Sequence, residues 1–186
     1  MKRMMATGLV LVLLLSLAVS LQARKPARKL QSRDVSAQVK DKMAVLGWLE
    51  GTWTGETMMS RSGQKLADAV ALTETVHFEM DGMILVLESI GRQGGDVVQH
   101  TWTTITWDAR RDSYRMTAVT DEGGLIQPQI NADERGMQWQ MKMGNARAKY
   151  TIEKDGNERK DSSYVAEITG EELEWKPVFS LTLQQQ

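Results

Sequence analysis

From Thr52 onward the chain alternates apolar and polar residues with the period of two that is typical of β-strands. Along 137–143 every second residue is apolar and the residues between them are polar; the apolar face carries Met137, Trp139, Met141 and Met143. A second clear stretch, 147–154, places Ala148, Tyr150 and Ile152 on one face. Such segregation predicts strands with one packed face and one wet face, as an antiparallel sheet provides.

Ten strands of this kind are predicted, separated by short turns rich in Gly, Asp and Asn. They are expected at 52–59, 71–80, 83–92, 97–108, 113–120, 125–132, 136–143, 147–154, 163–169 and 178–183. Asp81-Gly82 and Gly144-Asn145 have the composition of two-residue hairpin turns. A meander of about ten strands closes best as a barrel. The pattern therefore predicts an all-β fold, an antiparallel up-and-down β-barrel of about ten strands.

One helix is expected before the strands, from Val35 to about Leu46. Its apolar residues recur at helical spacing, and Asp34 can serve as its N-cap. We expect this short helix to act as a cap or plug of the barrel, so that 35–186 forms a single domain.

The N-terminus has the layout of a secretory signal peptide over residues 1–23. Lys2 and Arg3 precede an apolar run, Leu9 to Val19, that is shorter than the ~20 residues of a membrane-spanning helix. Cleavage would leave no stable membrane span and a basic leader, 24–34, expected to be disordered. The protein is thus predicted to be exported, to the periplasm or outside the cell. An uncleaved anchor, or a leader tethered to anionic lipid, are the alternatives.

The charge and the amino-acid composition exclude several classes of functional site. The formal net charge is −1 and no basic face is concentrated enough to indicate a nucleic-acid partner. The absence of cysteine excludes thiol nucleophiles, thiolate metal sites and a lipoprotein anchor. The fold must therefore be held by packing and by hydrogen bonds between strands.

The segment 46–56 reads Leu-Gly-Trp-Leu-Glu-Gly-Thr-Trp-Thr-Gly-Glu. Its Gly-x-Trp-x-Gly-Glu spelling resembles the first strand of calycin-type barrels, the group that includes lipocalins, fatty-acid-binding proteins and nitrobindins. The closest resemblance is to an exported bacterial calycin-like family of unknown function. The resemblance implies that Gly51 and Trp53 are structural and that Trp53 closes one end of a ligand-holding barrel.

The function predicted from these features is non-enzymatic binding of a small, largely apolar molecule inside the barrel. Aromatic and thioether side chains suit such a cavity, and the chain holds six Trp and twelve Met. The candidate ligand-binding residues are Trp139, Met141, Met143, Tyr150, Trp102 and His77.

A cofactor is not identified. The haem-binding nitrobindins carry their proximal His near the C-terminus, and residues 125–186 contain no His, so haem is not implied. The thioethers of Met141 and Met143 could hold Cu(I), but Met is also an adaptable filler of apolar faces. No metal site is predicted.

Two other function classes stay open. An enzyme, isomerase-like or hydrolase-like, acting on a hydrophobic substrate would need His77, Glu79 and Arg115 to converge on a buried pocket. No Gly-x-Ser-x-Gly or comparable catalytic motif is present. A structural or interaction protein would instead have a filled barrel, with an internal void below about 300 Å³.

Overall fold

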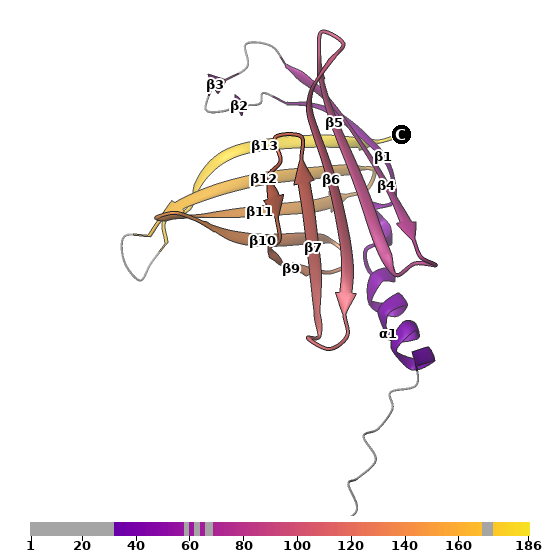
Figure 1. Cartoon of the computed structure of the whole chain (residues 1–186). Coiled ribbons are helices and arrows are strands. Elements are labelled where there is room, and N and C mark those ends of the chain that lie inside the picture. The colour runs from indigo at the N-terminus through magenta and orange to yellow at the C-terminus, as the bar shows by residue number, and fades with distance from the viewer. Residues whose placement is uncertain (1–31, 58–59, 62–63, 66–68, 169–172) are drawn as a thin grey trace, which may run out of the picture. The chain divides into compact units, whose positions relative to one another are not determined.

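Among the residues that the structure describes, ten antiparallel strands close into a barrel (Figure 1). The computed structural model describes residues 32–57, 60–61, 64–65, 69–168 and 173–186. The ring consists of β1 (Gly51–Thr57), β4 (Val70–Glu79), β5 (Ile84–Gln93), β6 (Asp96–Asp108), β7 (Ser113–Thr120), β9 (Gln129–Ala132), β10 (Gly136–Met143), β11 (Ala146–Asp155), β12 (Glu158–Glu167) and β13 (Lys176–Gln185). The predicted signal peptide, 1–23, lies outside the described residues.

Each strand of the ring pairs with the ring strands that precede and follow it in the chain, including β7 with β6 and β9. The pairing of β13 with β1 closes the ring. A short strand, β8 (Leu125–Ile126), adds to β7, and β2 (Ser60–Arg61) pairs with β3 (Gln64–Lys65) as a separate hairpin. The predicted antiparallel barrel of about ten strands is confirmed.

Three details of the predicted strands are wrong. The strand expected at 125–132 is divided into β8 and β9 by Gln127 and Pro128, because proline has no N–H to donate to the ladder. β12 begins at Glu158, five residues before the expected start. The turn at Asp81-Gly82 is not a two-residue turn, since four residues connect β4 to β5. Gly144-Asn145 does join β10 and β11 as a two-residue turn, with Gly144 at φ 61°.

A helix and a 3₁₀ turn cover one end of the barrel. α1 (Ser32–Ala44) starts three residues before the expected Val35, so Asp34 lies in its first turn, where a carboxylate is favourable, instead of capping it. η1 (Gly47–Leu49) follows. Met43, Leu46 and Leu49 are fully buried in the same core cluster as residues of the barrel wall. The predicted cap is therefore present at this end.

Hydrogen bonds hold this cap to the barrel. The Tyr114 hydroxyl donates to the carbonyl oxygen of Lys42 at 2.7 Å, and Trp48 Nε1 donates to the carbonyl oxygen of Asp133 at 2.9 Å. The Lys42 ammonium also lies 4.9 Å from the centre of the Trp107 ring. The C-terminal end of α1 and the η1 turn are thus fixed by contacts with residues far away in the sequence.

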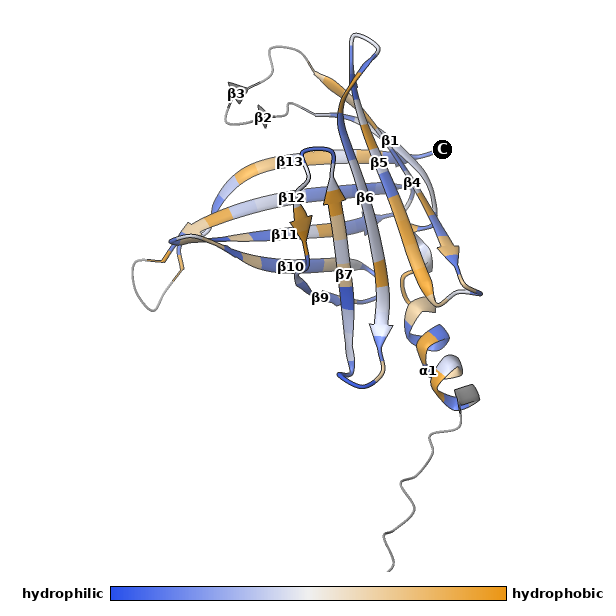
Figure 2. Cartoon of the chain, in the orientation of Figure 1, coloured by the Kyte–Doolittle hydropathy of each residue, from blue (hydrophilic) through white to orange (hydrophobic). Residues whose placement is uncertain are grey.

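The strands differ in how clearly they alternate (Figure 2). β4 reads Val-Ala-Leu-Thr-Glu-Thr-Val-His-Phe-Glu, and its buried positions Val70, Leu72, Glu74 and Val76 alternate with exposed ones. β12 reads Glu-Arg-Lys-Asp-Ser-Ser-Tyr-Val-Ala-Glu and is polar on both faces over its first half. β12 therefore presents polar residues to the inside of the barrel as well as to the outside, which affects the cavity described below.

Gly55 is expected to be required for the close approach of β1 and β13. A Cβ at Gly55 would lie 2.5 Å from the Thr182 carbonyl oxygen and 2.8 Å from Leu183 Cδ2. We expect Gly55→Ala to lower the free energy of unfolding by about 1–3 kcal/mol, because the backbone oxygen cannot move without disturbing the sheet. Gly47→Ala is the control, since nothing lies within 4 Å of its Cβ. Equal stability of the two variants in urea denaturation would contradict this account.

Candidate functional site

A cavity of about 510 Å³ lies inside the barrel. One part of its wall is apolar and runs along β7, β8, β10 and β11; it consists of Met116, Ala118, Ile126, Met137, Trp139, Met141, Tyr150 and Ile152. The other part carries hydroxyls and carboxylates from β4, β5, β6 and β12; it consists of Glu74, Ser89, Thr101, Thr103, Asp161, Ser162 and Ser163. Leu72, Leu87, Ile105, Leu181 and Phe179 add apolar surface between the polar groups. The lumen is amphipathic.

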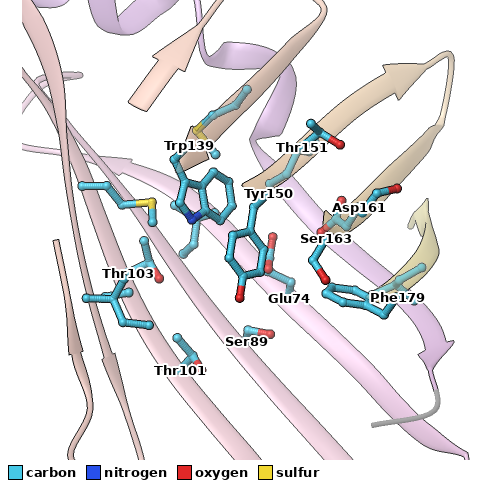
Figure 3. Close-up of a pocket in the computed structure, with 18 of the residues that line it drawn as sticks. Glu74, Ser89, Thr101, Thr103, Trp139, Tyr150, Thr151, Asp161, Ser163 and Phe179 are labelled. Carbon is cyan, nitrogen blue, oxygen red and sulfur yellow. The ribbon is translucent and has the colours of Figure 1, made fainter. Parts of the chain in front are cut away.

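Trp139 and Tyr150 form the aromatic surface of the apolar wall (Figure 3). They are directly opposed on β10 and β11, and their rings stack with centroids 5.2 Å apart and an interplanar angle of 8°. Burial raises the pKa of the Tyr150 hydroxyl above its ordinary value, so the phenol stays neutral at physiological pH. The stack offers a flat, uncharged surface to a ligand.

The structure separates the predicted ligand-binding residues into two groups. Trp139, Met141 and Tyr150 line the cavity, whereas Met143 lies at the end of β10, is 54% exposed and does not line it. Trp102 and His77 are outside the barrel: Trp102 is 45% exposed, and His77 Nε2 lies 3.3 Å from Glu79 Oε1 on the outer surface. The prediction that Met143, Trp102 and His77 contact the ligand is therefore wrong, because a ligand in the cavity would not reach these three residues.

Strand parity explains this correction. On β6 the lining residues are Thr101, Thr103 and Ile105, so the even-numbered Trp102 faces outward. On β4 the lining residues are Leu72 and Glu74, so the odd-numbered His77 also faces outward. On β4 the alternation in the sequence contained this information, since His77 shares its face with Thr73 and Thr75, whereas on β6 threonines occupy both faces.

The acid–base cluster that an enzyme would need is not assembled. His77 and Glu79 lie on the outer surface and Arg115 is exposed on β7. The other histidine, His100, pairs with Glu88 through Nε2 and Oε1 at 2.9 Å, also on the outer wall. In the described part of the chain, no group of three or more His, Asp or Glu side chains could hold a metal ion.

The structure contains a buried ionic cluster next to the cavity that the sequence did not predict. Arg159 on β12 is fully buried; its Nη1 donates to Glu74 Oε1 at 2.5 Å, and its Nε and Nη2 donate to the two oxygens of Asp161 at 2.9 Å each. The Asp161 and Glu74 side chains are 18% and 12% exposed, and both line the cavity. One guanidinium is thus shared by two carboxylates.

The pKa of Asp161 in this cluster lies above the ordinary value of an aspartate. Burial raises the pKa of Asp161 to about 6; the Arg159 charge acts in the opposite direction, and the Glu74 charge adds to the rise. The pKa of Arg159 is itself raised, because the two carboxylates outweigh the effect of burial. With both carboxylates ionised, the cluster has two negative charges and one positive charge.

Trp53, one of the two residues predicted to be structural, lies beside this cluster, and the other, Gly51, lies against Gln185 at the start of β1. Trp53 is fully buried, its Nε1 donates to the Leu49 carbonyl oxygen at 2.7 Å, and the Arg159 guanidinium lies 5.3 Å from its ring centre. Gly51 has φ 128°, a conformation that favours glycine. Trp53 connects the η1 turn to the ionic cluster and does not line the cavity.

No family model matches the chain, and no similar sequence is found among curated proteins. Within the described ranges, none of the helical segments combines the length and the apolar composition needed to cross a membrane.

Proposed function

We propose that the protein is an exported, non-enzymatic binding protein of calycin type that holds a small, largely apolar ligand inside its barrel. The observation that carries the proposal is the cavity of about 510 Å³, walled on one part by the Trp139–Tyr150 stack and by methionines. Its size falls in the range of small-molecule pockets, ≈ 300–1,000 Å³. Export is supported by the signal-peptide pattern of residues 1–23.

The cavity favours this function over the two alternatives. A barrel used only as a structural or interaction module has no need for an interior void, and this one exceeds the threshold of about 300 Å³. A calycin-like enzyme would need titratable side chains arranged around the substrate. The carboxylates of Glu74 and Asp161 are instead engaged by Arg159, with no His beside them.

A lumen-filling variant tests the proposal. We expect wild-type protein to bind a neutral apolar fluorophore, N-phenyl-1-naphthylamine, and Thr101→Trp to weaken this binding at least about tenfold, because the new indole occupies the cavity. Thr104→Trp is the matched control: it lies on the same strand, three residues away, and does not line the cavity. The measurement is fluorescence titration at pH 7.

Two results would count against the proposal. Failure of the wild-type protein to bind the fluorophore, or to retain any small molecule in native mass spectrometry when purified from its own host, would argue against a binding function. Equal affinity of Thr101→Trp and Thr104→Trp would place the probe outside the barrel. Unchanged unfolding midpoints of the two variants show that both are folded.

A further inference from the structure

We infer that the ligand carries a protonated amine, and that Asp161, with Glu74 beside it, is the site that receives this group while the Trp139–Tyr150 stack holds the apolar body. This inference rests on the proposed function and names the chemical class of its ligand. It is carried by the placement of the Glu74 and Asp161 carboxylates on the cavity wall (Figure 3), where both share the guanidinium of Arg159 buried behind them.

The first argument is charge. Asp161 and Glu74 both line the cavity. Among the described residues, the only basic side chain that forms an ion pair with them is Arg159, which is fully buried and does not line the cavity. No lysine or arginine is among the described lining residues. With both carboxylates ionised, a charge of −1 is left uncompensated in a region of low dielectric. A cation entering the lumen would balance it, and a carboxylate would add to the repulsion.

The second argument is hydrogen bonding. Each Asp161 oxygen accepts one N–H from Arg159, and a carboxylate oxygen can accept a further bond. Gln99, another lining residue, has its Oε1 buried without a hydrogen-bond partner in the described structure. An alkylammonium group supplies three donors and no acceptor. The polar part of the wall therefore suits a donor-rich head group better than an acceptor.

The third argument is the division of the lumen. The apolar arc over β7 to β11 meets the polar part of the wall where Ile152 on β11 is paired with Asp161 on β12, so a ligand that fills the lumen touches both surfaces and is best matched by an amphipathic molecule. A flat or aliphatic body against Trp139 and Tyr150, with a single cationic end, meets both conditions. The neighbours that face Asp161 across the sheet, Ile152 and Leu181, are apolar and add no compensating charge.

The test uses ligands matched in chain length: decylamine, decanol and decanoate, each displacing N-phenyl-1-naphthylamine from wild-type protein at pH 7. We expect decylamine to bind at least about tenfold more tightly than decanol, because a charge-assisted hydrogen bond is added, and decanoate to bind most weakly. Similar affinity of all three would overturn the inference and leave the proposed function standing. Tighter binding of decanoate would overturn the inference, and binding of none would contradict both.

An isosteric variant assigns the preference to its residue. Asp161→Asn removes the carboxylate charge and should bring decylamine to within about threefold of decanol, while decanol binding stays the same. Asp96→Asn, exposed at the start of β6, is the control and should keep the full preference. A preference that survives in Asp161→Asn would overturn the assignment. If Asp161→Asn folds poorly, the comparison of the three ligands on wild-type protein still tests the inference, because it needs no variant.

The pH profile provides a second readout. The pKa of Asp161 is about 6, so its carboxylate is mostly ionised at pH 7.5 and mostly protonated at pH 5, whereas an alkylamine stays cationic throughout. The groups that act on this titration are Arg159 and Glu74. Decylamine affinity should therefore fall as the pH is lowered through about 6, while decanol affinity should stay level. A flat decylamine profile would overturn the role of Asp161.

Discussion

Replacing Arg159 with methionine is expected to lower the free energy of unfolding by about 3–5 kcal/mol at pH 7, one of the two largest single effects in this protein. The guanidinium is fully buried and is bound to both Glu74 and Asp161. Its removal leaves two carboxylates with little water and no counter-charge. It also removes the cation that lies over the Trp53 ring. The measurement is urea denaturation followed by tryptophan fluorescence.

The sign of the pH dependence distinguishes this mechanism from simple loss of packing. In Arg159→Met the orphaned carboxylates can be relieved only by protonation, so the deficit relative to wild type should shrink as the pH falls from 7 to 5. Wild-type Asp161 already has a raised pKa, about 6, so its contribution to stability is present below the unfolded value, near 3.8, and is lost as the pH rises through 6. In Arg159→Met we expect the same loss of stability with rising pH, and we expect it to be larger than in the wild-type protein.

Two further variants complete this experiment. Arg115→Met, exposed on β7, should change the stability by less than about 0.5 kcal/mol. Replacing the whole cluster, with Arg159→Met, Glu74→Met and Asp161→Leu together, should recover most of the loss, because no buried charge is left unpaired. If the single and triple variants are equally unstable, the cost comes from packing and the charge argument fails.

Alternation along the chain was sufficient to predict the barrel and much of its lumen. Trp139 and Tyr150 lie among apolar residues on strands whose other face is polar, so period-two parity alone predicts that they point inward together. The same parity places His77 on the outer face of β4. Its choice as a ligand contact followed residue type and neglected this face. On β6 threonines occupy both faces, so the alternation did not decide on which side Trp102 lies.

The ionic cluster could not be predicted in this way. The first half of β12 is polar on both faces, so alternation gives no indication that Arg159 and Asp161 point inward, and a run of charged residues resembles a solvated turn. Only ring closure brings β12 near β4 and places Arg159 on Glu74, 85 residues away in the chain. Paired burial of charges depends on tertiary contacts, which a local pattern does not contain.

Trp53→Ala is expected to cost about 3–5 kcal/mol, because it empties the space of a fully buried indole and leaves the Leu49 carbonyl without its donor. Trp102→Ala, at a half-exposed position on β6, is the matched control and should cost less than about 0.5 kcal/mol. Urea denaturation of both variants, followed by far-ultraviolet circular dichroism, provides the measurement. Comparable losses in the two would contradict the closure role of Trp53.

The Trp53 effect should also be coupled to that of Arg159, since the guanidinium lies 5.3 Å from the indole centre. In a double-mutant cycle, Trp53→Ala with Arg159→Met should be less destabilising than the sum of the single changes, by about 0.5–2 kcal/mol. Trp53→Ala with Arg115→Met, on the strands β1 and β7 that do not pair, should be additive. Additivity in both cycles would mean that the two residues stabilise the closed end independently. Coupling only in the first would show that Trp53 stabilises the barrel partly by holding in place the cation that both lumen carboxylates share.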